Sequence, residues 1–101
     1  VAAAANNLGV ACTEAGDYVR AENLHMQALS IRETAYGPMH PDVAQSMANL
    51  AVVYHVSGAE KKAHGYYGGA LDIFKRFRPD DDEEVQTVKA NHAALLQKLG
   101  Y

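Results

Sequence analysis

Apolar residues recur along this chain at the three- and four-residue spacing of one helix face. Val1, Ala5, Leu8 and Cys12 form the first such stripe. Similar stripes follow along the chain, and the breaks between them carry glycine, proline or both. The pattern predicts an all-α chain of five helices, at about residues 1–15, 17–36, 41–57, 60–77 and 82–99.

The helices repeat with a period of 42 residues. Three series of identical residues keep this interval: Asn7, Asn49 and Asn91; Gly16, Gly58 and Gly100; and Val1, Val43 and Val85. A fixed period in this range is typical of a solenoid, in which each repeat stacks on its neighbours. We therefore expect one domain over residues 1–101, with repeat one at 1–42, repeat two at 43–84 and a half repeat at 85–101.

The helix ends carry the residues that helix ends favour. Gly16 and Gly58 fit the left-handed conformation at a helix end, Asp17 is suited to cap the next helix, and Pro41 fits a first turn. The predicted helix at 60–77 also contains glycines in its interior, where each costs about 1 kcal/mol relative to alanine. Either a neighbouring backbone approaches closely there, or the helix is locally weak.

The repeated residues resemble the tetratricopeptide repeat. Repeat two supplies the large, small and aromatic residues of that pattern at Met47, Leu50, Ala51, Tyr54, Gly58, Ala63, Tyr67 and Ala70. Repeat one supplies Leu8, Gly9, Cys12, Gly16, Ala21, His25 and Ala28. The 42-residue period and the segment Gly37-Pro38-Met39-His40-Pro41 resemble the kinesin-light-chain subtype. The half repeat departs from the pattern, with His92 where leucine is usual.

This resemblance implies a right-handed α-solenoid of antiparallel helix hairpins that acts as a protein–protein interaction module. In this family the first helix of each repeat lines a concave groove that holds an extended peptide. Carried onto this chain, the groove-facing asparagines are Asn7, Asn49 and Asn91. Helical spacing adds the groove residues beside them, which are Asn6, Val10, Thr13, Gln45, Val52 and His55. An asparagine carboxamide both donates and accepts, so it can pair with a peptide backbone without reading its side chains. Alternatively, the asparagines hydrogen-bond to the adjacent helix.

Charge and composition exclude several classes of binding partner. The net charge of −3 argues against a nucleic-acid surface, and no apolar run is long enough for a membrane helix. The first helices of both complete repeats lack lysine and arginine, which argues against a preference for strongly acidic tails. A single cysteine, Cys12, suits a reducing compartment and therefore a cytoplasmic location.

Catalytic and metal chemistry is not expected. The five histidines show no ligand spacing, and no cysteine pairs accompany them. Cys12 lies on the apolar stripe, which favours an inert core thiol, and His25 occupies the aromatic core position of its repeat. We expect no cofactor, no metal site and no enzymatic activity.

Two other functions remain open. The chain has no initiator methionine and ends in a half repeat, so it is expected to be a piece of a longer solenoid. It would then serve as a structural interior segment, and its exposed terminal helices could self-associate end to end. A regulatory or nucleic-acid-binding role is the less favoured alternative, because no basic stripe is present.

Overall fold

The fold is an array of five α-helices, described here from a computed structural model over residues 2–100. The helices are α1 (Ala2–Glu14), α2 (Tyr18–Tyr36), α3 (Pro41–Ser57), α4 (Glu60–Phe77) and α5 (Glu83–Leu99). They match the five predicted helices within one or two residues at each described end. Val1, where the first was expected to begin, lies outside the described residues.

Local sequence sets the helix ends: Asp17, Pro41 and Gly58 act as predicted, and His40 is a cap that was not predicted. Asp17 accepts a hydrogen bond from the backbone N–H of Arg20 at 3.3 Å and so caps α2. His40 accepts from the N–H of Asp42 at 3.0 Å, and Pro41 follows it in the first turn of α3. Gly58 ends α3 at φ 93°, a left-handed conformation that glycine adopts without steric cost.

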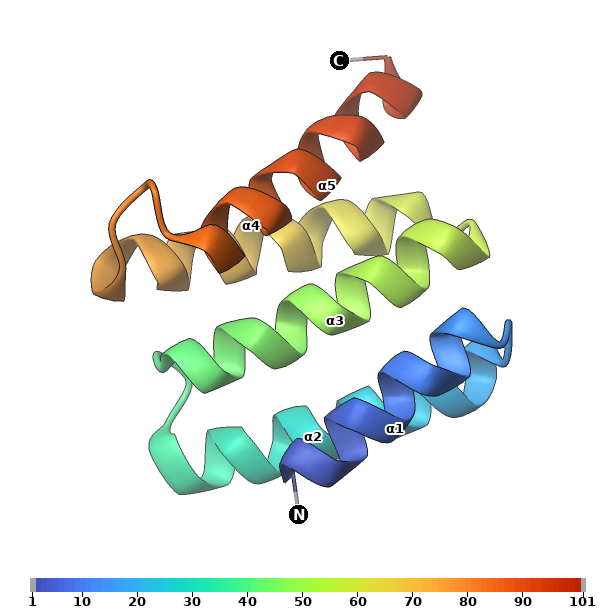
Figure 1. The fold of residues 1–101 in the computed structure, drawn as a ribbon, viewed down its shortest axis with the longest axis horizontal. Helices are drawn as coiled ribbons and strands as arrows, with labels where there is room; N and C mark the ends of the chain where they lie inside the picture. Colours follow the sequence, from blue (N-terminus) through green and yellow to red (C-terminus); the bar gives the residue numbers. More distant parts are fainter. Residues whose placement is uncertain (1, 101) are drawn as a thin grey trace.

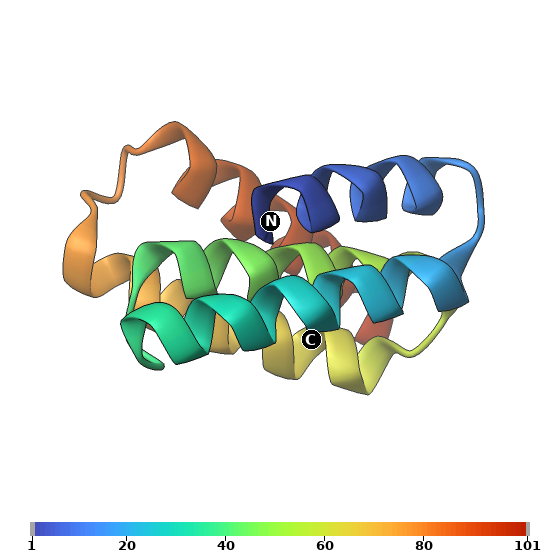
Figure 2. The same cartoon turned by 90° about the horizontal axis from the view of Figure 1, so that it is seen from below.

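The helices pack in two layers. In Figure 1, α1, α3 and α5 lie towards the viewer, and α2 and α4 lie behind them. In Figure 2, which is seen from below, α1 and the first part of α5 lie above α3, and the later part of α5 passes behind α3 and ends lower. We call the side formed by α1, α3 and α5 the front face, and the side formed by α2 and α4 the back face.

The main core lies where α3 meets α4, α2 and α5. Its largest fully buried side chains are Tyr67, Phe74, Leu50 and Leu95. A smaller cluster joins Cys12, Ala21 and Val53. Burial of these apolar surfaces supplies the main stabilising free energy of the array, and it requires neighbouring hairpins to stack, as expected for a solenoid.

The predicted stripe on the first helix is wrong at one position. Leu8 is 44% exposed, whereas Leu50, its counterpart 42 residues later, is fully buried. Asn6, Gly9 and Cys12 are the buried residues of α1 instead. Leu50 points into the main core that α2 and α4 help to close, but no described helix covers the corresponding side of α1.

The interior glycines of α4 differ in their surroundings. A Cβ on Gly69 would come 2.5 Å from Cε of Met47, but nothing lies within 4 Å of a Cβ on Gly65 or Gly68. Close approach therefore explains one of the three glycines, and the approaching group is a flexible side chain rather than backbone. Gly65 and Gly68 have no packing reason in the described residues and weaken the helix locally.

Candidate functional site

A hollow of about 260 Å³ lies on the front face between α1 and α3. Its lining is Ala3, Asn6, Asn7, Val10, Arg32, Gln45, Asn49 and Glu84. Five of the predicted groove residues are in this set: Asn6, Asn7, Val10, Gln45 and Asn49. Helical periodicity places them together because α1 and α3 present the same register of their repeats to the front.

The asparagines at the 42-residue interval share one property. Asn7 is exposed, and Asn49 and Asn91 are half-buried. Within residues 2–100, the structure records no side-chain hydrogen bond for any of the three. Their carboxamides therefore present unused donors and acceptors, two of them in one hollow and the third on α5.

Asn6 behaves differently from its neighbour Asn7. It is 5% exposed, and its Oδ1 lies 3.1 Å from Nδ1 of His25 on α2. His25 is 1% exposed, and its burial lowers the pKa of the imidazole below its ordinary value. The carboxamide oxygen of Asn6 is thus engaged inside the first hairpin, which agrees with the expectation that His25 is a packed core residue.

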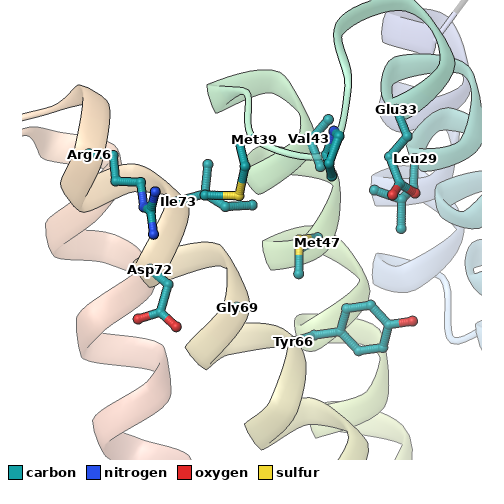
Figure 3. Close-up of a pocket in the computed structure, with 11 residues that line it drawn as sticks. Leu29, Glu33, Met39, Val43, Met47, Tyr66, Gly69, Asp72, Ile73 and Arg76 are labelled. Atoms are coloured by element: carbon teal, nitrogen blue, oxygen red, sulfur yellow. The ribbon is translucent and has the colours of Figure 1, made fainter.

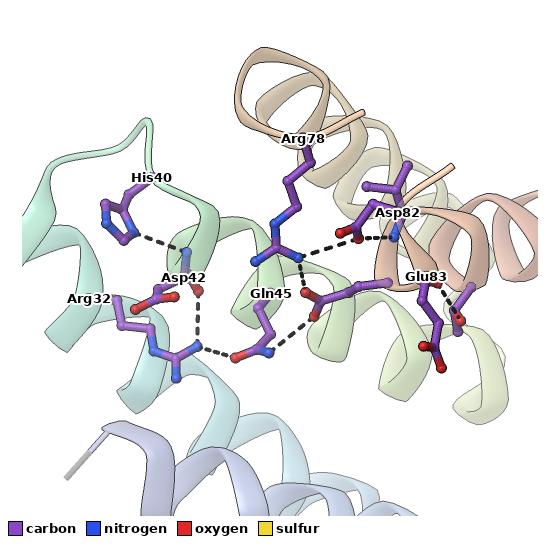
Figure 4. A network of polar contacts seen from close by, with 10 residues as sticks. Arg32, His40, Asp42, Gln45, Arg78, Asp82 and Glu83 are labelled. Atoms are coloured by element: carbon purple, nitrogen blue, oxygen red, sulfur yellow. Dashed lines mark hydrogen bonds and ion pairs between the residues drawn. The ribbon is translucent and has the colours of Figure 1, made fainter. Parts of the chain in front are cut away.

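Gln45 is also engaged within the protein. Its Oε1 accepts a hydrogen bond from Nη1 of Arg32 at 2.9 Å, and its Nε2 donates to Oε2 of Glu84 at 3.1 Å (Figure 4). Both ends of this carboxamide have partners, so Gln45 connects α2, α3 and α5. It forms a wall of the hollow rather than an available binding group.

Arg32 lines the hollow, although the sequence patterns did not indicate it. It lies on α2, is 8% exposed, and donates through Nη1 to the carbonyl of Asp42 and to Oγ of Ser46 as well as to Gln45. Its counterpart 42 residues later is Phe74, a fully buried core residue. The patterns assign second helices to the back, so only the long side chain of Arg32 brings this charge to the front.

The charge of Glu84 is compensated by its neighbours. Its Oε1 accepts from Arg78, and Arg78 also lies 3.7 Å from the carboxylate of Asp82, which caps α5 (Figure 4). With Oε2 held by Gln45, both carboxylate oxygens are occupied. The hollow therefore contains one arginine and one carboxylate, and both are largely satisfied by internal contacts.

The other predicted groove residues lie outside this hollow. Thr13 donates through Oγ1 to the carbonyl of Gly9 at 2.8 Å. His55 Nδ1 lies 3.2 Å from the hydroxyl of Tyr67 on α4, and Val52 packs against the main core. Asn91 lies on α5, which the hollow reaches only through Glu84.

A second hollow, of about 540 Å³, lies on the back face between α2 and α4. Figure 3 shows the thioether groups of Met39 and Met47 between the side chains of α4 and those of α2. Leu29, Val43 and Ile73 add to its apolar lining, and Glu33, Asp72 and Arg76 supply its charges. Sequence reasoning did not identify this hollow, because its residues come from three helices and a loop.

No cluster of metal ligands and no membrane-spanning helix is found among residues 2–100. The structure places no group of three or more histidine, cysteine, aspartate or glutamate side chains where they could hold a metal ion. No described helix combines the length and hydropathy needed to cross a bilayer. Cys12 is buried, as expected for a core thiol.

Comparison with known proteins points to one family. The family model described as tetratricopeptide repeat matches residues 1–76. The chain is also 30% identical, over 97 residues, to the protein KINESIN LIGHT CHAIN-RELATED 2 of Arabidopsis thaliana. That alignment covers 96% of this chain but 15% of the relative, so the chain spans a small part of that protein's length.

Proposed function

Because this chain belongs to the tetratricopeptide repeat family and is kinesin-light-chain-like, we propose that it is a non-catalytic module that binds an extended peptide along its front face. The observation that carries the proposal is the series Asn7, Asn49 and Asn91. These carboxamides recur at one interval on the front-face helices and have no recorded hydrogen-bond partner within residues 2–100. A polar side chain that recurs in a solenoid without an internal partner is suited to an external one.

The chemistry of the carboxamide determines what it recognises. Each asparagine can donate to a backbone carbonyl and accept from a backbone N–H of the same extended segment. Repeated carboxamides along a solenoid would therefore hold main chain at regular intervals, largely independently of side-chain identity. Asparagine is also a mediocre helix former, so its presence in the middle of α1 and α3 has a local cost that binding would justify.

The hollow itself favours uncharged segments. Both oxygens of Glu84 are occupied, and Arg32 already donates to a carbonyl, a carboxamide and a hydroxyl. A strongly acidic or basic segment would have to disrupt these contacts before it gained new ones. Ala3 and Val10 line the hollow beside Asn7 and leave room for small apolar side chains.

The test uses peptides selected on the wild-type chain from a random linear display library. Asn49→Ala should weaken binding of the selected peptides about tenfold, the loss expected for one or two hydrogen bonds. Melting and helicity should be nearly unchanged, because Asn49 has no recorded hydrogen-bond partner to lose. Asn23→Ala is the matched control, since Asn23 is an exposed asparagine of α2 on the other layer. Equal affinity of the wild type and Asn49→Ala by calorimetry would remove the groove assignment.

A second candidate function is structural. Leu8 is exposed although its counterpart Leu50 is fully buried, so the outer side of α1 presents an apolar residue that a stacked helix would cover. A segment of this kind would serve mainly as a scaffold in a longer array, or would associate with another copy. Sedimentation of the isolated chain decides between these roles and the peptide-binding module: a strict monomer at high concentration argues against self-association, and Leu8→Glu should abolish any dimer.

A further inference from the structure

Two histidines that are 28 residues apart in the sequence meet between α4 and α5. Nδ1 of His64 lies 2.9 Å from Nε2 of His92, and the ring centroids are 5.0 Å apart. The ring of His92 also packs against Tyr67, with centroids 5.5 Å apart. His92 occupies the position that leucine holds in the other repeats, at Leu8 and Leu50. The side of α5 that turns towards α4 therefore carries a titratable group where repeat two carries a core residue.

We propose that the His64–His92 hydrogen bond is an acid-sensitive contact that holds α5 on α4 and thereby controls the contribution of α5 to the front face. This inference rests on the proposed peptide-binding function, because α5 carries Asn91 beside His92 and Glu84 at the edge of the hollow. Loss of the His64–His92 contact on mild acidification weakens peptide binding. At neutral pH the His64–His92 contact is formed.

The chemistry of imidazole protonation predicts that the contact breaks as pH falls. Two neutral imidazoles, or one neutral and one protonated, can share an N–H···N hydrogen bond, because one ring nitrogen still accepts. When both rings are protonated, every ring nitrogen is a donor and the two cations repel each other. The second proton therefore breaks the contact. Burial, together with the neighbouring His64, lowers the pKa of His92 below its ordinary value, so that the neutral form of His92 prevails at neutral pH.

Other charged groups lie on the helices around the pair, and two of the lysines among them are held in ion pairs with carboxylates. On α4, Lys61 precedes His64 by one turn, and Glu60 is held by Lys98 of α5 at 3.3 Å. On α5, Lys89 precedes His92 by one turn and pairs with Asp80 at 3.5 Å. On α3, His55 lies against Tyr67, the residue that His92 packs on. Two cations in contact make the doubly protonated pair unstable while α5 is docked, so protonation of both rings drives the two helices apart.

The test compares wild type with His92→Leu, which restores the leucine of the other repeats and removes the titration. Hydrogen exchange, corrected for its intrinsic pH dependence, reports the docking of α5 without any partner. Between about pH 7.5 and about pH 5, the range of histidine titration, α5 amides of the wild type should lose protection. Those of His92→Leu should keep it. His25 also titrates, so the amides of α1 and α2 are followed separately.

The second measurement is binding of the same library-selected peptides at both pH values. Loss of the contribution of Asn91 should weaken wild-type binding about fivefold at the lower pH and leave His92→Leu unchanged. Equal α5 protection at the two pH values, or equal loss in His92→Leu, would overturn the proposal whether or not peptides bind. If α5 responds as stated but no peptide binds at any pH, the peptide-binding function fails and the acid-sensitive contact stands alone.

Discussion

Oδ1 of Asn6 and Nδ1 of His25 form the buried polar contact that joins the two helices of the first hairpin, at 3.1 Å. The second hairpin joins its two helices through a different polar contact. Tyr67 occupies the position of His25, and Ala48 occupies that of Asn6. The hydroxyl of Tyr67 instead contacts His55, two turns further along α3 than Ala48. A hydrogen-bonding residue at the core position thus has a matching partner on the facing helix in each repeat.

Asn6→Ala should destabilise the protein. The substitution leaves a ring nitrogen of His25 buried without its partner, which costs about 1–3 kcal/mol of unfolding free energy. Urea denaturation followed by circular dichroism measures the difference. Asn7→Ala is the control one residue away: Asn7 is exposed with no recorded bond, so its replacement should change stability by less than about 0.5 kcal/mol. Equal effects of the two substitutions would mean that the Asn6–His25 bond contributes nothing.

Two glycine-to-alanine substitutions should change the stability of the protein in opposite directions. A Cβ on Gly9 would lie 2.7 Å from Nε2 of His25, and the ring is confined by burial and by Asn6, so Gly9→Ala should cost about 1–3 kcal/mol. A Cβ on Gly65 meets nothing within 4 Å, so Gly65→Ala should stabilise α4 by up to about 1 kcal/mol. Thermal melts of both variants provide the comparison. Stabilisation by Gly9→Ala would show that the first hairpin relaxes more easily than its packing suggests.

Stability should decrease as pH falls below the ordinary histidine value of 6.5. Burial lowers the pKa of His25, so the unfolded chain binds the proton more readily than the native one. The stabilising contribution is therefore complete above 6.5 and is lost as pH falls through the depressed value of the native state. Urea midpoints measured at about pH 7.5 and about pH 5.5 should differ in the wild type. His25→Gln should reduce that difference, and His92 accounts for part of the remainder.

Gln45→Ala should separate Arg32 from Glu84. The substitution removes the bridge between α2 and α5 and leaves Arg32 with Asp42 and Ser46 as acceptors. We expect a loss of about 1–2 kcal/mol in urea denaturation. Gln27→Ala, an exposed change on α2, is the control and should lie within about 0.5 kcal/mol of wild type. If Gln45→Ala unfolds at the wild-type midpoint, the bridge has no net stabilising effect.

The sequence by itself determined the helices and their order. Local signals are enough for this, because glycine and proline end helices through their own backbone preferences, and a side-chain cap such as Asp17 acts within one turn. The 42-residue interval also determined that Asn7, Asn49 and Asn91 occupy the same register on successive first helices. Helical periodicity states which side of a helix a residue occupies, and in a repeat array that side is the same in every copy.

Only the tertiary structure decided which of these residues have partners. Periodicity cannot say which neighbouring side chain lies across a helix contact, so it did not distinguish Asn6, bonded to His25, from Asn7, which has no recorded bond. Periodicity also did not predict the contact of Arg32 with Gln45 or that of His64 with His92. These contacts depend on the reach of the side chains and on the packing of α2 on α3 and of α4 on α5. The burial of Leu50 and the exposure of Leu8 follow from the same cause, since identical positions in a repeat differ in burial when only one of them has a helix stacked over it.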